Sequence, residues 1–387
     1  MAAPSGRSAN LRLLHAVESA DLAGARAALA AGAQPNVKSE GGIPALLIAA
    51  RRSDTDLVTA LLDRGADVNA TGGQGYTALT ILPPEATSAL IQELLDRGAD
   101  PNRANTHGAT PLVRFSGTDR LSVVRMLLDK GADVNAKNPD GTTALMAAAA
   151  TGSKLPIVQL LLDRGADINA KDADGGTALT VAALAQGDSI PALQLLLDRG
   201  ADVSTINAGH SSWNPLTEAA RRSDSVLFHF LLAHGADINA KDRWGRTALE
   251  SLLPFSGAWE RPLRLLLDNG ADVNARNAGG DTPLMEEAGE RNPAALQVLL
   301  AHGADVNAKD GNGLTTLMVA TGCYNDAEAV KILLAHGADV NAKDNKGVTA
   351  LGVARRQHNA ETINLLKAAG AKDEEQRRPL PTPSGVL

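Results

Sequence analysis

Leu61-Leu62-Asp63-Arg64-Gly65-Ala66-Asp67-Val68-Asn69-Ala70 identifies the architecture of the chain, because close copies of this stretch recur from end to end. Degraded copies surround Gly32 and Gly370. Consecutive repeat glycines lie 33 to 35 residues apart. A fixed period of this size is typical of an array of stacked repeats. The other full copies surround Gly98, Gly131, Gly165, Gly200, Gly235, Gly270, Gly303 and Gly337.

The first half of this stretch predicts the end of a helix. Val58, Leu61 and Leu62 are spaced as one apolar stripe of a short helix. Gly65 stands where a helix ends in a left-handed residue, a conformation that glycine adopts without steric cost. Asp67 and Asn69 are turn formers whose side chains bond nearby backbone groups. We therefore expect a helix followed by an exposed finger.

A second helix is expected twelve residues after most of these glycines, where a threonine starts a Thr-Ala-Leu or Thr-Pro-Leu motif. Threonine is a good N-cap, and proline is tolerated in the first helical position. Each unit therefore reads as helix, loop, helix and a projecting finger that resembles a β-hairpin. The motif begins at Thr77, Thr110, Thr143, Thr177, Thr247, Thr282, Thr315 and Thr349.

These motifs resemble the ankyrin repeat, over about residues 11–371. The resemblance implies an all-α solenoid, a curved and elongated array of about eleven helix-turn-helix units. The family's Thr-Pro-Leu-His motif ends in a histidine, and this chain replaces that histidine in its repeats. We expect each replacement to lose a hydrogen bond between helix and turn. The replacing residues are Thr80, Val113, Met146, Thr180, Thr217, Glu250, Met285, Met318 and Gly352.

The chain of 387 residues is expected to form one array, because each repeat contacts only its neighbours. Residues 1–10 are predicted to be a polar leader, and residues 372–387 a disordered, charged and proline-rich tail. Pro83 and Pro84 predict an early end to the first helix of their unit, because proline breaks a helix interior.

Composition excludes several classes of partner. The net charge of −7 disfavours nucleic acid, which requires a basic footprint. We expect no membrane span, because no apolar run is long enough. The single cysteine, Cys323, suits a reducing compartment. The sequence predicts a cytoplasmic monomer, and its Ala, Arg and Gly content suggests a bacterial source.

The motifs that resemble chemical sites have simpler explanations. Asp172-Ala173-Asp174-Gly175 resembles the start of a calcium loop, but the position of the essential glutamate is Ala183. His234, His302 and His336 occupy equivalent places in different units, so the stacking spreads them about 10 Å apart. We predict no metal, no cofactor and no catalytic residue. A Lys-Asp pair that recurs in the fingers is interpreted as a solvated turn, with charge recognition of a partner as the alternative.

Residues that break the repeat at outward positions are the candidate binding site, because packing does not explain an aromatic side chain on a finger tip. Trp, Tyr and Arg are also enriched at interface hot spots. By resemblance to the family, fingers and first helices form the concave binding face. One alternative is that Trp213 folds back over its own finger, and another is that the arginine pairs are solvated helix ends. The candidates are Trp213, Arg243, Trp244, Arg246, Tyr76, Phe255, Arg221 and Arg222.

The function predicted from these features is a protein–protein interaction scaffold or adaptor without catalytic activity. The partner is a protein whose identity the sequence does not give. The alternative is a regulatory or antitoxin-like subunit, or an exported effector, of a bacterial system that uses the same surface.

Overall fold

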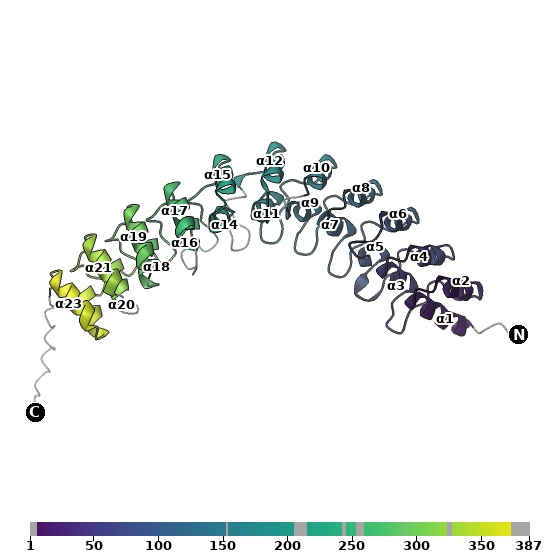
Figure 1. The fold of residues 1–387 in the computed structure, drawn as a ribbon, viewed down its shortest axis with the longest axis horizontal. Coiled ribbons are helices and arrows are strands. Elements are labelled where there is room, and N and C mark those ends of the chain that lie inside the picture. Colours follow the sequence, from purple (N-terminus) through teal and green to yellow (C-terminus); the bar gives the residue numbers. More distant parts are fainter. Residues whose placement is uncertain are drawn as a thin grey trace, which may run out of the picture. The chain divides into compact units, whose positions relative to one another are not determined.

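The computed structural model describes residues 6–151, 154–204, 215–241, 245–252, 259–290, 292–322 and 327–372. The chain divides into two compact units, Met1–Thr205 and Ile206–Leu387. The described part of each unit is built from helix pairs that follow one another along the chain (Figure 1). Trp213, Arg243, Trp244, Phe255, Cys323 and all of the predicted tail except Lys372 lie outside the described residues.

In the first unit, the first helices of the pairs form one row and the second helices another (Figure 1). The first helices are α1 (Gly6–Glu18), α3 (Ala45–Arg51), α5 (Ala78–Ile81), α7 (Pro111–Ser116), α9 (Ala144–Ala149) and α11 (Ala178–Leu184). The second helices are α2 (Leu22–Ala30), α4 (Thr55–Leu62), α6 (Ser88–Asp96), α8 (Leu121–Asp129), α10 (Leu155–Asp163) and α12 (Ile190–Asp198). A short 3-10 turn, η1 (Gly73–Gly75), lies in one finger.

The second unit has the same two rows. Its first helices are α14 (Pro215–Arg221), α16 (Ala248–Leu252), α18 (Pro283–Gly289), α20 (Thr316–Gly322) and α22 (Ala350–Arg356). Its second helices are α15 (Ser225–Ala233), α17 (Glu260–Asp268), α19 (Pro293–Ala301), α21 (Ala327–Ala335) and α23 (Ala360–Ala368). The protein is therefore an all-α repeat array. Its fingers contribute only isolated antiparallel bridges in the described residues, such as Lys38 with Pro44.

The local signals in the sequence form the helix ends that they predict. Thr110 caps α7 by accepting a hydrogen bond from the Val113 backbone N–H at 3.3 Å. Gly65 has φ +85°, the left-handed conformation expected after α4. Helix α5 ends at Ile81, just before Pro83 and Pro84, as the prolines predict.

The apolar stripe of each helix is buried between the rows. Leu57 and Leu61 of α4 are fully buried, as are Leu90 and Leu94 of α6. Phe115 replaces a small residue on α7 and is also fully buried. A buried leucine contributes on the order of 2 kcal/mol, so the stacking of these stripes supplies most of the stability.

Two expectations from the sequence need correction. Helix α1 starts at Gly6, so residues 6–10, predicted as a polar leader, lie within it; Ala9 is fully buried. The replaced histidines also do not all lose their hydrogen bond. Thr80 and Thr180 accept one from the backbone N–H of the capping threonine at 2.8 Å and 2.7 Å, and Glu250 does so at 2.6 Å.

Candidate functional site

Arg221 and Arg222, predicted to bind a partner, both bind a glutamate of their own helix, α14. Arg221 contacts the two carboxylate oxygens of Glu218 at 2.7 Å and 2.8 Å, and Arg222 contacts one at 2.6 Å. Glu218 is only 5% exposed. Burial alone would raise the pKa of Glu218, but hydrogen bonds from the two arginines hold it below its usual value. One of the two positive charges is therefore neutralised within the helix.

Arg246, which was also predicted to bind a partner, is half-buried just before α16, and its charge acts on the nearby Glu286. Glu250 is 1% exposed and caps α16 through its bond to the Thr247 N–H. Burial, Glu250 and Asp281 raise the pKa of Glu286, while an Asn277 hydrogen bond of 2.9 Å and the charge of Arg246 oppose the rise. This part of the second unit is polar and mixed in charge.

Tyr76 is half-buried at the equivalent place in the first unit, just before the threonine that starts α5. Its ring centroid lies 6.4 Å from that of His107 on the next finger. Among the described residues, the Tyr76 hydroxyl has no hydrogen-bond partner. The structure thus places one predicted aromatic residue on the finger surface with its polar end available.

Arg114 lies next to this group and was missed by the sequence reasoning. Its Nη1 donates to the Thr80 carbonyl of the preceding repeat at 3.2 Å. Burial lowers the pKa of Arg114, and the fields of Tyr76 and Glu85 oppose this shift. A signal was present in the sequence, because Arg114 stands four residues after its capping threonine. The equivalent residues of the first unit's next repeats on either side are Ile48, Ile81, Ala147 and Val181.

Basic residues that recur in several fingers join neighbouring repeats. Lys137 Nζ donates to the Lys171 carbonyl at 2.9 Å, and Lys309 Nζ donates to the Lys343 carbonyl at 3.0 Å. Arg276 bonds the Lys309 carbonyl in the same way, at 2.6 Å. These bonds favour the interpretation of the Lys-Asp pairs as structural turns.

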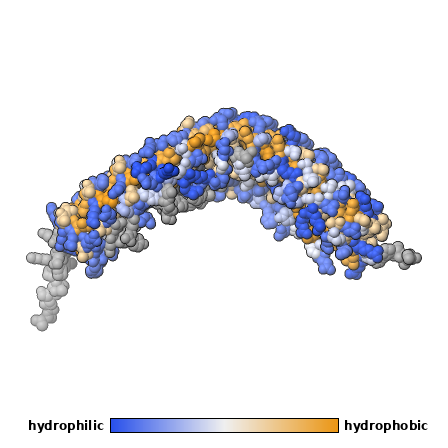
Figure 2. Space-filling view, viewed as in Figure 1, coloured by the Kyte–Doolittle hydropathy of each residue, from blue (hydrophilic) through white to orange (hydrophobic). Residues whose placement is uncertain are grey.

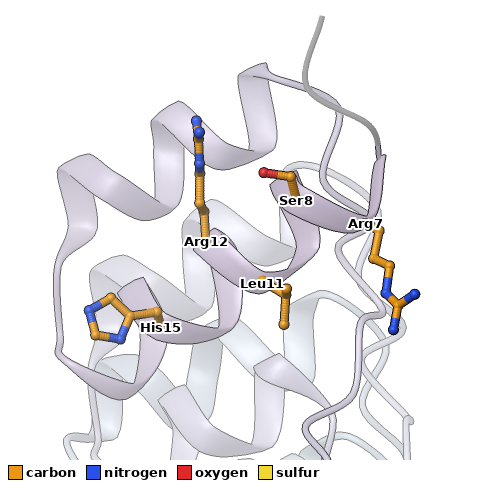
Figure 3. Close-up of a pocket in the computed structure, with 5 residues that line it drawn as sticks. All are labelled: Arg7, Ser8, Leu11, Arg12 and His15. Carbon is orange, nitrogen blue, oxygen red and sulfur yellow. The ribbon is translucent and has the colours of Figure 1, made fainter.

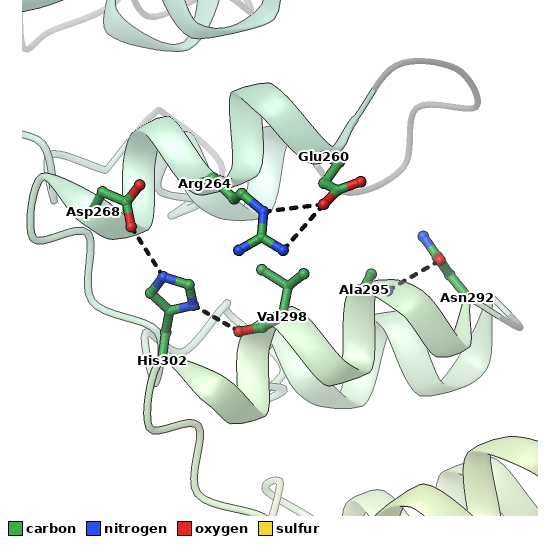
Figure 4. Close-up of polar contacts among 7 residues, drawn as sticks. All are labelled: Glu260, Arg264, Asp268, Asn292, Ala295, Val298 and His302. Carbon is green, nitrogen blue, oxygen red and sulfur yellow. Dashed lines mark hydrogen bonds and ion pairs between the residues drawn. The ribbon is translucent and has the colours of Figure 1, made fainter.

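The recurring histidines are also held by nearby groups. Nδ1 of His302 lies 2.7 Å from the Val298 carbonyl, and its Nε2 lies 3.1 Å from Asp268 of the preceding repeat (Figure 4). In the first unit, basic residues in this position pair with the equivalent aspartate: Arg97 with Asp63 at 2.6 Å, for example. His302 thus occupies the position that basic residues of the first unit use for exposed polar contacts between second helices.

Glu287 of α18 is the most unusual carboxylate among the described residues. It is 1% exposed, and neither of its oxygens has a hydrogen-bond partner. Burial raises its pKa to about 7, with Glu290 and Glu286 adding to the rise and the nearby Asn292 opposing it. Every other described repeat has an apolar, buried residue in this place, as at Ala148 or Phe115.

The remaining described surface offers few apolar contacts. Figure 2 shows mainly hydrophilic side chains on the visible face of each unit, with hydrophobic patches between them. Leu11 of α1 and Val226 of α15 are the exposed large apolar residues of the described chain, at 62% and 67%. Leu11 lies in a shallow depression with Arg7, Ser8, Arg12 and His15, whose side chains point in different directions (Figure 3). This depression has no converging polar groups.

Within the described ranges, no group of His, Cys, Asp or Glu side chains is arranged to hold a metal ion. No helix in that part of the chain is long and apolar enough to cross a membrane.

Stacked helix pairs with glycine-ended second helices and cross-linked fingers define a helical repeat solenoid. Family models describe the repeats further. The ankyrin repeat model matches residues 41–73, and the model of ankyrin repeats in three copies matches 85–172, 154–242, 260–344 and 288–377. The chain belongs to the ankyrin repeat family. Ankyrin repeats are generally protein–protein interaction modules and are typically non-catalytic. No curated protein matches the chain.

Proposed function

We propose that this protein is a non-catalytic scaffold or adaptor that binds a partner protein through its fingers and first helices. It acts as a monomer, and its net charge of −7 supports a protein rather than a nucleic acid as the partner. The binding residues proposed from the sequence are Trp213, Arg243, Trp244, Arg246, Tyr76, Phe255, Arg221 and Arg222.

One observation supports this proposal above the others: the residue just before the capping threonine varies from repeat to repeat and is half-buried. It is Tyr76, Ala109, Thr142, Arg246, Asp281, Leu314 or Val348 in different repeats. The threonine that follows it is buried and has the same capping role in successive repeats. A fixed scaffold therefore presents a column of side chains whose chemistry packing does not dictate.

The column differs between the two units. In the first unit it includes Tyr76 and Thr142, whereas in the second it includes Arg246 and Asp281. Large aromatic and arginine side chains dominate binding energy at interfaces, so the proposal gives most weight to Trp213, Trp244 and Tyr76. Arg221 and Arg222 contribute less free charge than their sequence suggests, because Glu218 binds both.

A comparative capture experiment tests the proposal. The wild-type chain and the double variant Trp213→Ala/Trp244→Ala are immobilised and exposed to lysate of the source cell. Trp259→Ala is the matched control, because Trp259 precedes α17 and is not on a finger. We expect a protein retained by wild type and by the control but lost by the double variant, with circular dichroism showing that all three are folded. Equal retention by all three would exclude the tryptophan site.

A further inference from the structure

The guanidinium of Arg114 is half-buried but makes only one hydrogen bond that the structure describes, to the Thr80 carbonyl. A guanidinium carries several N–H donors and stays protonated in proteins. No described carboxylate is within ion-pair distance of Arg114, and Glu85 is exposed. The Arg114 guanidinium carbon lies 5.5 Å from the centroid of the Phe115 ring, but most of its N–H donors have no hydrogen-bond acceptor within the described protein.

Three other arginines of the same unit find acceptors within the protein. Arg120 donates to the Pro84 carbonyl at 2.8 Å and to the Ser88 hydroxyl at 3.2 Å. Arg164 pairs with Asp129 at 2.8 Å, and Arg199 pairs with Asp163 at 3.1 Å. The Thr80 carbonyl and the Phe115 ring offset part of the free-energy cost of burying this cation, and an external anion that accepts from its remaining donors would stabilise it further.

Tyr76 completes an anchor for such an anion. Tyr76 directly precedes the Thr77 cap of α5, the helix whose Thr80 carbonyl accepts from Arg114, and among the described residues the Tyr76 hydroxyl donates to no acceptor. The fingers beneath it are fastened together, because the Thr106 backbone N–H and hydroxyl both donate to the Gln74 carbonyl, at 3.0 Å and 2.7 Å. A platform fixed before binding loses less conformational entropy when a ligand arrives.

The residues on either side of Arg114 in the first-helix row are apolar. Ile81 is half-buried four residues after Thr77, and Ala147 and Val181 are half-buried at the equivalent places of the next repeats. A chain lying along this row would meet apolar side chains, then one cation, then apolar side chains again. A free phosphate or a uniformly acidic chain would match only the central part of this pattern.

We propose that Tyr76 and Arg114 anchor the carboxylate of an Asp or Glu residue in an extended partner segment, with apolar residues on both sides of that acid. Arg114 supplies a two-pronged hydrogen bond, and the Tyr76 hydroxyl supplies a third donor. The overall excess of acidic residues in this protein makes the local positive charge selective, because acids elsewhere on the surface repel the same segment. This inference rests on the proposed function but uses a different part of the chain from Trp213 and Trp244.

Selection from a displayed library of random peptides on the immobilised full-length chain tests the inference. We expect the wild type to enrich peptides with one Asp or Glu between apolar residues. A synthetic copy of an enriched peptide should bind Arg114→Met more weakly by on the order of tenfold, measured by fluorescence anisotropy. The matched control is Arg125→Met, which removes an exposed arginine of α8 and should leave binding unchanged.

Two further variants keep the test decisive. Arg114→Lys retains the charge but not the forked geometry, so it should also weaken binding if Arg114→Met proves unstable in thermal melts. Replacing the acid of the peptide by its amide should weaken binding to the wild type as much as Arg114→Met weakens binding of the acidic peptide. The same replacement should not weaken binding to Arg114→Met any further. Peptides without an acid, no enrichment at all, or equal binding to wild type and Arg114→Lys would overturn the inference. Binding that Trp213→Ala/Trp244→Ala abolishes and Arg114→Met does not would leave the proposed function standing and reject this site.

Discussion

Asn69 and Asp100 belong to successive repeats, and the side-chain oxygen of Asn69 accepts a hydrogen bond of 2.8 Å from the Asp100 backbone N–H. The side-chain nitrogen of Asn69 donates to the Gly98 carbonyl of the same neighbour at 2.9 Å. One amide therefore satisfies two backbone groups of the following finger. Equivalent bonds join the fingers at Asn36, Asn102 and Asn135 in the first unit, and at Asn239, Asn274, Asn307 and Asn341 in the second.

Replacing Asn69 by alanine should therefore lower the free energy of unfolding. The loss should be about 1–2 kcal/mol, because two backbone groups at a half-buried place lose their partner. Urea unfolding followed by circular dichroism measures it. Asn69→Asp keeps the acceptor but brings an oxygen against the Gly98 carbonyl, so it should destabilise as well. An unchanged midpoint for both variants would show that water replaces these bonds.

Alanine substitutions at Gly141 and Gly175 distinguish the cost of backbone strain from the cost of a steric clash with the next finger. Both have left-handed φ, +82° and +84°. A Cβ at Gly141 would lie 2.6 Å from the Asp172 Cα of the next finger, whereas at Gly175 nothing lies within 4 Å. Gly175→Ala should cost about 1–2 kcal/mol through strain alone, and Gly141→Ala clearly more. Equal losses in urea unfolding would mean that the fingers move apart freely.

Leu266 of α17 is fully buried, which agrees with its place in the apolar stripe read from the sequence. Leu266→Ala should destabilise the protein by about 2–5 kcal/mol, because it leaves a cavity in the core. Leu265→Ala is the matched control, since Leu265 is half-buried on the same helix and should cost less. Melting temperatures measured by circular dichroism distinguish the two. A larger loss at Leu265 would contradict the register of this helix.

Glu287 should make stability depend on pH. Its pKa is about 7 in the folded state, raised from 4.5 mainly by burial. The folded state then holds a proton that the unfolded state has lost, so this residue's contribution is fully present below about pH 4.5 and declines as the pH rises through 7. The difference between the two pKa values corresponds to roughly 3 kcal/mol in the free energy of unfolding, which is lost over the pH interval between them.

Urea unfolding at several pH values from about 5 to about 8 tests this sign. Glu287→Ala restores the apolar residue type found in this place in the other described repeats. This variant should be more stable than wild type at the high end of the range and should lose most of the slope over it. Glu361→Gln removes an exposed acid of α23 that does not act on the Glu287 carboxyl, and it is the control. A wild type that gains stability with rising pH would show that the Glu287 carboxylate is ionised at little cost.

Several features of the fold followed from the sequence because their causes are local. The Thr77 cap, the end of α5 before Pro83 and the left-handed Gly65 each depend on residues within a few positions. Local sequence signals identified only part of the candidate site. Tyr76 was identified as a break in the repeat, but Arg114 was missed because its significance depends on Thr80 and Tyr76 of the preceding repeat.

The sequence by itself determined the repeat period, the helix pairs and the buried stripes, because the spacing of leucine, glycine and threonine encodes them directly. Only the tertiary structure decided which polar side chains are already bound. Asn69 was expected to bond its own turn, but its partners are Gly98 and Asp100. Arg114 binds the Thr80 carbonyl of the preceding repeat and retains unused donors. The reason is that a side chain's partners across a repeat boundary depend on the offset between stacked fingers, which spacing along the chain does not specify.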